Sequence, residues 1–483
     1  SDAETFTDWV VAAARDSYTT QVDNWGFDAP PDANGDHTIA INDGTNLFHG
    51  SDSTDAWSGP NRQIDVQSNL SEFVEIGLGY DYSSVETLVG VATGHEFFHG
   101  IQWGYNQWKG GSPDWNWLIE GQARFIQSVQ YESEEFNETP PSHHMYPGTA
   151  NDYLTGELPA SLRGLSYAAC LYWRFLYEHY QGATGGQPIR ILERALTATQ
   201  SVGNDPVVDG EVAMNAALSG GGGSYTTFDA SIADFSKANY YLTLDNPPLA
   251  YQHEDVYSDP QVAHTASFNG SQQAINGSVP VPFGMDFVNV SMIAPFCAIS
   301  ATMVIDSDVV ITPTFVVVDS NTLERAYPVS LDSQNRGTVR LSGLGAGIGD
   351  WVGIVLARLD SDESKSANYA ITIGDMYRIT EPTQEKPAYA GPHNGANKII
   401  VKVIDSTCGR TRNGFTVQIG GKIASIISVS QGHDGYVLEV RPPNQPANGL
   451  YDLAVVAGGN YKTEKQAVSY VNLNNVDVEL VID

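Results

Sequence analysis

The chain has 483 residues, which is too many for a single hydrophobic core and indicates several domains. Its 57 acidic residues outnumber 24 basic ones, and the formal net charge of -33 would repel nucleic-acid phosphates and anionic membranes. We therefore expect neither partner. The acidity suits an extracellular setting, in which charge keeps the surface hydrated.

The N-terminal stretch predicts one helix and one strand. Helical periodicity covers residues 4–22, and a strand is expected over 37–42 after a polar loop. Such a strand could line a cleft and pair with an extended substrate. The loop offers oxygen atoms whose spacing weakly resembles a calcium site, but its glycine is misplaced for an EF-hand, and a solvated turn is the alternative. These oxygen atoms belong to Asp32, Asn34, Asp36 and Asp43.

The most informative motif is the H-E-x-x-H sequence of His95, Glu96 and His99, in a stretch that predicts a helix from residue 85. Residues four apart share a helix face, so both imidazoles can point at one ion. A second helix is expected over 120–131 and begins with Glu120. Two histidines and one glutamate are a known catalytic zinc set, whose fourth position is left to water. The alternative is a core helix with two hydrogen-bonded histidines and an ordinary surface acid at position 120.

The rest of the chain divides into a helical and a β part. Further helices are expected over 165–180, 187–200, 205–218 and 228–241. After about residue 255, short apolar runs alternate with turn residues, which is typical of β-sandwiches. The expected fold class is a multidomain protein with a mainly helical α+β catalytic domain followed by two all-β sandwich domains. The expected boundaries are 1–255, 256–380 and 388–470, with a linker over 381–387.

The expected strands of the first sandwich are 286–292, 298–305, 309–318, 337–341, 351–359 and 369–373. Those of the second are 398–404, 415–419, 423–430, 436–441 and 449–456. Parts of the second sandwich resemble TIG-type immunoglobulin-like domains. The tail, 471–483, resembles the first strand of a von Willebrand factor A domain that would continue beyond Asp483, and an ordinary last strand is the alternative.

Cysteine usage and hydropathy carry two further expectations. Cys170, Cys297 and Cys408 lie far apart, one in each expected domain, so we expect three free thiols. The most apolar stretch, 287–305, is interrupted by polar residues and alternates like strands, so no membrane span is expected. The chain lacks a signal segment, and we expect a mature extracellular or cell-surface form from which a signal was removed.

The helical half resembles the gluzincin zinc peptidases, which include thermolysin-like and aminopeptidase-N-like enzymes. The segment 95–102, with Trp117-x-x-Glu120-Gly121-x-Ala123, is closer to a group of secreted bacterial metalloproteases that carries HEFFHAIQ and W-x-x-E-G-x-A. The segment 165–178 also resembles a later helix of that group.

This resemblance implies zinc ligands at His95, His99 and Glu120, with Glu96 as the general base that acts on the zinc-bound water. Tyr167 is the candidate for stabilising the oxyanion, ahead of His143 and His144. Thermolysin-like enzymes have an Asp that orients one zinc histidine where this chain has Arg124, so the orienting partner must come from elsewhere or be a backbone carbonyl.

Two functions follow from the sequence. The first is a secreted zinc endopeptidase with a protein or peptide substrate, whose β modules could bind a cell-surface or extracellular-matrix partner. The second is a catalytically silent adhesin or structural subunit that retains the peptidase fold. The complete set His95, Glu96, His99 and Glu120 favours the peptidase, because a silent homologue would often have lost Glu96 or a ligand.

Overall fold

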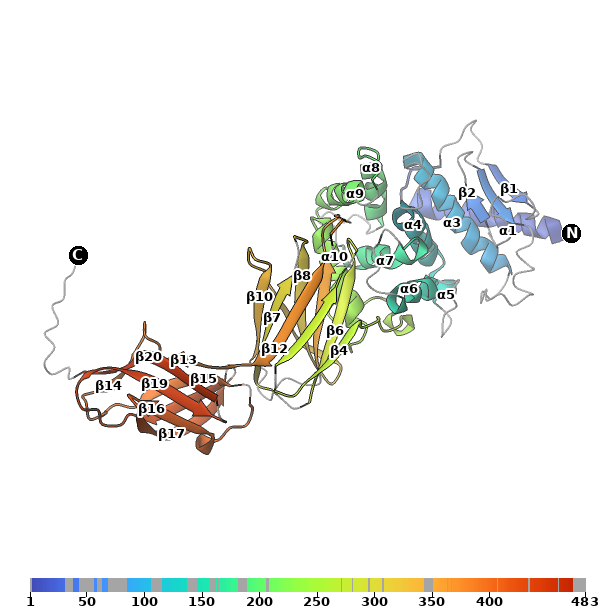
Figure 1. The fold of residues 1–483 in the computed structure, drawn as a ribbon. Helices are drawn as coiled ribbons and strands as arrows, with labels where there is room; N and C mark the ends of the chain where they lie inside the picture. The colour runs from blue at the N-terminus through green and yellow to red at the C-terminus, as the bar shows by residue number, and fades with distance from the viewer. Residues whose placement is uncertain are drawn as a thin grey trace.

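Helices fill the N-terminal half of the chain and strands fill the C-terminal half (Figure 1). This order of helices and strands confirms the prediction of a multidomain α+β protein. The computed structural model describes residues 2–30, 38–42, 56–58, 63–67, 85–105, 115–136, 146–156, 162, 165–180, 189–205, 208–270, 272–279, 281–293, 296–305, 308–342, 351–362, 364–365, 367–405, 407–432, 435–458 and 460–471. The expected calcium loop, His143, His144 and residues 472–483 of the tail lie outside these ranges.

Nine α-helices occur within the described part of the helical half. They are α1 (Asp2–Ser17), α3 (Val85–Tyr105), α4 (Asn116–Gln130), α5 (Glu132–Glu135), α6 (Tyr146–Thr155), α7 (Cys170–His179), α8 (Arg190–Thr199), α9 (Val208–Ser219) and α10 (Phe228–Tyr241). A π-helix, η1 (Tyr18–Asn24), extends α1, and a 3-10 turn, η4 (Tyr167–Ala169), precedes α7. Two further 3-10 turns, η5 (Glu254–Val256) and η6 (Arg412–Gly414), lie in later connections.

A small sheet lies beside α3, with the strand order β1-β3-β2. Its strands are β1 (Thr38–Asn42), β3 (Gln63–Gln67) and β2 (Ala56–Ser58). β1 pairs with β3 in parallel and lies at the sheet edge, where the sequence predicted a strand.

Helix α3 forms the centre of the helical core. It buries apolar side chains on several sides, including Leu88, Val89, Phe98 and Ile101. A helix that is apolar nearly all round is stable only inside a core, and α3 packs against α1, α4 and α8. The motif helix is therefore held rigidly from several directions.

Two sheets form the sandwich that follows, with orders β10-β7-β12-β5 and β4-β6-β11-β8-β9. The strands are β4 (His264–Phe268), β5 (Gln273–Ser278), β6 (Met285–Met292), β7 (Ala298–Ile305), β8 (Ile311–Asp319), β9 (Thr322–Pro328), β10 (Arg336–Ser342), β11 (Trp351–Arg358) and β12 (Asn368–Asp375). The inner faces share one core with Val288, Phe315, Ile354 and Ile371.

The outer face of the five-stranded sheet packs on the helical half. Met285 and Phe287 belong to the same apolar cluster as the helices. The Tyr240 hydroxyl of α10 donates to Asn289 Oδ1 at 2.6 Å and accepts from Trp351 Nε1 at 3.0 Å. Gly353 makes room for this contact, because a Cβ there would lie 2.0 Å from the Tyr240 hydroxyl. A sheet covered on both faces explains the nearly unbroken apolar run of β11.

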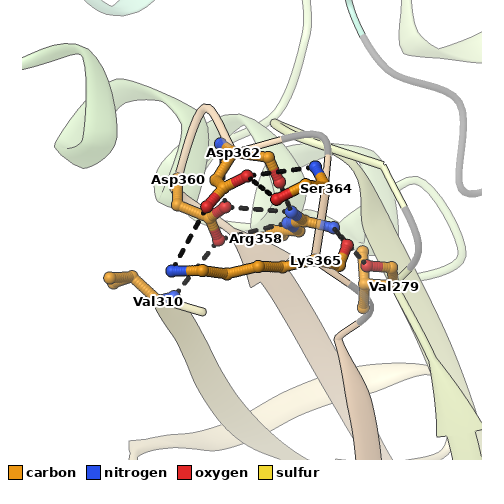
Figure 2. Close-up of polar contacts among 7 residues, drawn as sticks. All are labelled: Val279, Val310, Arg358, Asp360, Asp362, Ser364 and Lys365. Atoms are coloured by element: carbon orange, nitrogen blue, oxygen red, sulfur yellow. Dashed lines mark hydrogen bonds and ion pairs between the residues drawn. The ribbon is translucent and has the colours of Figure 1, made fainter. Parts of the chain in front are cut away.

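One buried arginine organises the turn after β11 (Figure 2). The Arg358 guanidinium is fully buried and bonds both carboxylate oxygens of Asp360, at 2.9 and 3.1 Å. It also donates to the carbonyls of Val279 and Lys365, at 3.3 and 3.1 Å. A buried charge is tolerable only when it is paired and hydrogen-bonded, and Arg358 meets that condition.

The last module has the strand order β13-β15-β18-β17-β16-β19-β20-β14. Its strands are β13 (Tyr377–Glu381), β14 (Ala388–Gly391), β15 (Ile399–Asp405), β16 (Phe415–Ile419), β17 (Lys422–Gly432), β18 (Gly435–Arg441), β19 (Gly449–Ala457) and β20 (Asn460–Tyr470). A separate apolar cluster that includes Val401, Val417, Leu438 and Val455 fills the module.

The expectation of three free thiols is wrong. Cys297, beside β7, and Cys408, in the last module, form a disulfide with a Cα–Cα distance of 5.2 Å across 111 residues of sequence. Phe296 and Thr407 form a β-bridge beside it. Tertiary contact between the two β regions brings these cysteines together, and sequence spacing does not reveal it. Cys170 is a buried free thiol, as expected.

Among the described helices, none is long and apolar enough to cross a membrane.

Candidate metal centre

Two helices bring the predicted ligands to one point. α3 carries His95 and His99 one turn apart, and α4 packs against α3 and carries Glu120. The Oε2 atom of Glu120 lies 3.4 Å from His95 Nε2 and 3.2 Å from His99 Nε2. All three ligand atoms lie within 4.8 Å of one another. The structure therefore assembles two imidazole nitrogens and one carboxylate oxygen from residues that the sequence singled out.

These groups fit a zinc ion. Glu120 Oε2 is buried, and the two imidazole Nε2 atoms are its neighbours among the described residues, at 3.2 and 3.4 Å. A buried carboxylate oxygen is costly in an apolar interior unless a donor or a cation is paired with it. A cation held by the three atoms would satisfy it, and His2Glu is a donor set that zinc prefers.

Gln102 is the partner that orients His99. The amide oxygen of Gln102 lies 2.7 Å from His99 Nδ1, which leaves Nε2 for the ion. The Gln102 amide nitrogen donates to the Ile119 carbonyl at 2.9 Å, next to Glu120. Sequence reasoning left this partner open, although Gln102 follows His99 by three residues and so shares its helix face.

The two histidines of the candidate site differ in their pKa. Burial lowers the pKa of His95 to about 4, against the opposing effect of Glu120. Burial acts in the same direction on His99, but Glu120, Glu96 and Gln102 outweigh it and raise the pKa of His99 to about 9. For Glu120, burial raises the pKa, but the two histidines outweigh it and hold the pKa well below its usual range. The His99–Glu120 pair thus holds one proton, which a metal ion would replace.

Glu96 lies next to His95 in the chain and is buried, with 8% exposure. Its carboxylate raises the pKa of both His99 and Tyr167, as a secondary cause in each case. The charge of Glu96 therefore acts on His99, a predicted metal ligand, and on Tyr167, the predicted oxyanion donor.

Tyr167 opens the 3-10 turn η4, just before α7 rather than within it. Its ring centroid lies 5.8 Å from that of His95, and the residue is 49% exposed. Partial desolvation, followed by the charges of Glu120 and Glu96, raises the pKa of Tyr167 well above its usual range. The hydroxyl accordingly stays protonated and can donate a hydrogen bond.

Gly121 explains how Tyr167 comes so close to the ligands. A Cβ at Gly121 would lie 3.0 Å from the Cβ of Ala169, so only a glycine lets α4 approach η4 this closely. The Glu-Gly-x-Ala sequence thus combines a ligand with the small residue that admits the neighbouring turn. The sequence marks this glycine by its motif, but its packing role depends on tertiary structure.

Arg124 occupies the position where a thermolysin-like enzyme has an orienting acid. It lies one helical turn after Glu120 and is largely buried, with its Nη2 3.3 Å from Thr149 Oγ1. Its positive charge contributes to the lowered pKa of His95, behind burial and His99. The charge of Arg124 thus acts on His95, whereas Gln102 is the residue that orients His99.

A second anchor fixes the start of the motif. The Gln21 side chain of η1 donates to the Gly94 carbonyl at 3.0 Å and to Gln130 Oε1 of α4 at 2.8 Å. A Cβ at Gly94 would lie 2.8 Å from the Tyr131 ring. The residue before His95 is therefore clamped between the N-terminal helix and α4. Nothing in the sequence pattern marks Gln21 for this contact.

No protein-family model matches the sequence, and no curated protein matches it. Among solved structures, a pre-peptidase C-terminal domain of a collagenase from Bacillus anthracis covers 24% of this chain and 99% of its own, at 12% identity and a TM-score of 0.19. A periplasmic inhibitor of g-type lysozyme from Aeromonas hydrophila covers 23% and 95%, at 8% identity and a TM-score of 0.15.

A titin tandem of immunoglobulin domains covers 43% of this chain and 93% of its own, at 9% identity and a TM-score of 0.17. Similarities this low say nothing about function. The functional argument rests on the candidate metal centre.

Proposed function

We propose that the chain is a secreted, zinc-dependent peptidase of the gluzincin type, with His95, His99 and Glu120 as zinc ligands. The observation that carries the proposal is the convergence of two Nε2 atoms and one carboxylate oxygen within 4.8 Å of one another, with Glu96 next in the chain to His95. The set supplies three metal ligands and a proton acceptor for the attacking water.

When bound, zinc supplies Lewis acidity and activates a water molecule for attack. Glu96 takes a proton from the attacking water and passes it to the leaving amine. The Tyr167 hydroxyl, which its surroundings keep protonated, donates to the oxygen that gains negative charge. Gln102 bonds Nδ1 of His99 and so leaves Nε2 for the ion, and Gly121 lets Tyr167 lie near Glu120.

The disulfide supports the extracellular part of the proposal. Disulfides persist in oxidising compartments and are rare in the cytosol. Cys297 and Cys408 form one between the two β regions. The substrate class we propose is a protein or peptide, with the β modules available for a cell-surface or matrix partner.

The test compares casein cleavage by the whole chain and its Glu96→Gln variant, with zinc content measured in both. We expect the variant to keep zinc and to lose activity by a factor of about 100 or more, because only the proton acceptor is removed. Glu86→Gln is the matched control, since Glu86 is an exposed acid on the same helix.

Two results would contradict the proposal. Equal cleavage by parent and Glu96→Gln would show that Glu96 is not the base. A parent that binds zinc but cleaves neither casein nor a randomised peptide library would point to the catalytically silent adhesin or structural subunit.

A further inference from the structure

A cavity of about 740 Å³ opens on the first β-sandwich, away from the metal centre in the helical half. It lies where the edge strands β4 and β5 of the two sheets meet, near the starts of β6 and β12. Its polar lining comes from His264, Asn276, Ser278, Asp286, Asn368 and Tyr369.

Asp286 is the unusual residue of this cavity. It is 1% exposed, and its Oδ2 accepts a hydrogen bond from the Tyr369 hydroxyl at 2.6 Å. Its Oδ1 is also buried and has no hydrogen-bond partner among the described residues. Because a buried acceptor without a donor is costly, Oδ1 is a position at which a ligand donor would be stabilised.

Gly277 shapes the cavity opposite Asp286. A Cβ there would lie 2.2 Å from the Tyr369 hydroxyl and 2.7 Å from His264 Nε2. Any larger residue would displace the tyrosine that bonds Asp286. Glycine in a strand interior lowers strand stability, and here it leaves room where polar groups converge.

The lining favours one chemical class. Apart from Asp286, its polar side chains are two amides, two hydroxyls and an imidazole, and Ala263, Val304 and Ala370 add apolar surface beside them. The Tyr369 hydroxyl, which donates to Asp286, remains available as an acceptor. A metal ion would find a single carboxylate residue in the lining, fewer than protein calcium sites usually provide, and an anion would be repelled by Asp286. An organic ammonium group would have to compete with His264, whose Nε2 already lies 4.0 Å from the same carboxylate.

We propose that this cavity binds a neutral saccharide, with one sugar hydroxyl donating to Asp286 Oδ1 and others bonding the amides and hydroxyls around it. Vicinal hydroxyls match a lining of mixed donors and acceptors, and the partly exposed mouth leaves space for a longer glycan. The site would attach the protein to a carbohydrate surface, and it does not depend on the peptidase assignment.

The test is saturation-transfer NMR on the whole chain with methyl glycosides of glucose, galactose and mannose, N-acetylglucosamine, and methylammonium as the cationic alternative. We expect transfer to at least one sugar at millimolar concentration and none to methylammonium. Titration of that sugar against Asp286→Asn should weaken binding about tenfold or more, because a hydrogen bond to a charged acceptor is lost.

Gly277→Ala should also remove binding by filling the cavity. Thr302→Ala, on an exposed site of β7 outside the lining, is the control and should bind as the parent does. If Gly277→Ala does not fold, Asp286→Asn alone decides. The proposal is overturned if no sugar shows transfer, if methylammonium alone does, or if Asp286→Asn binds as tightly as the parent. Zinc content and casein cleavage are measured separately, so a failed peptidase assignment leaves this result readable.

Discussion

Gln102 is a single side chain that connects the two helices of the metal centre. Replacing it by leucine removes the acceptor for His99 Nδ1 and keeps a similar side-chain size. We expect zinc affinity to fall about 10- to 100-fold, as is common when the partner of a metal-binding histidine is lost. Competition against a chromophoric chelator measures the affinity directly.

Gln127→Leu is the matched control for that change. Gln127 is another buried glutamine, on α4, and it bonds Glu135 rather than a ligand. Its loss should lower stability without changing zinc affinity. Equal affinity losses in both variants would mean that Gln102 acts through general packing and not through His99.

At the scale of elements, the approach of α4 to η4 decides where Tyr167 lies. Gly121→Ala places a Cβ 3.0 Å from Ala169 Cβ, so the turn must move outward by a few tenths of an ångström or more. We expect zinc content to stay the same and peptidase activity to fall roughly 10-fold, because a misplaced catalytic group loses its alignment. Activity per bound zinc is the measurement.

Gly100→Ala is the control on α3. The nearest atom to its added Cβ would be Pro30 Cβ at 3.4 Å, an ordinary contact, so activity should hold. Stability should rise by about 0.5–1 kcal/mol, because alanine is the better helix former. A Gly121→Ala variant as active as this control would contradict the role we assign to close packing at Gly121.

Element prediction succeeded where the pattern was strong and local. The helices α3 and α10 have apolar residues at helical spacing, the strands β7 and β11 carry apolar or β-branched runs, and the expected ranges overlap the observed ones. The sequence did not predict β9 or β20, because both are rich in charged and polar residues and depend on neighbours for pairing. The sequence also did not predict the short helices α5 and α6, because α5 consists of charged and polar residues and α6 begins with Tyr-Pro-Gly and has few apolar residues.

The candidate site divides along similar lines. His95, Glu96 and His99 follow from helical spacing, and Glu120 from the start of the next helix. Gln21 lies 73 residues before the carbonyl that it bonds, so local spacing cannot indicate that contact. The cysteine pairing is non-local in the same sense, since it depends on how the two β regions meet.

At the scale of the whole molecule, the junction of the helical half and the sandwich holds an unfavourable carboxylate. Asp229 lies in the first turn of α10, and its buried Oδ1 has no hydrogen-bond partner within the part of the chain that the structure describes. Burial, and then the charges of Glu211 and Asp360, raise the pKa of Asp229 to about 6. The folded state therefore binds more protons at this site than the unfolded state between about pH 4 and pH 6.

Stability from this site should accordingly be greatest below about pH 4 and be lost as the pH rises through 6. Asp229→Asn removes the charge, so it should stabilise the protein by about 1–2 kcal/mol at pH 8, after allowance for partial exposure, and have almost no effect at pH 4. Thermal unfolding of parent and variant at both pH values gives the difference. A variant whose advantage is the same at pH 4 and pH 8 would contradict the assignment.

The disulfide between the β regions gives the last prediction. Its loop spans 111 residues, and beside it Ala298, Met376 and Ile404 form only a small apolar contact. Because an apolar contact of this size stabilises only weakly, we expect the disulfide to hold the last module against the sandwich. We expect the Cys297→Ser/Cys408→Ser variant to keep its zinc and both β folds, but to show a larger radius of gyration by small-angle scattering.

Thiol titration of the denatured parent should find one thiol, Cys170, without reductant and three after reduction. Three thiols without reductant would contradict the disulfide. An unchanged radius of gyration in the variant would mean that non-covalent contacts hold the last module in place.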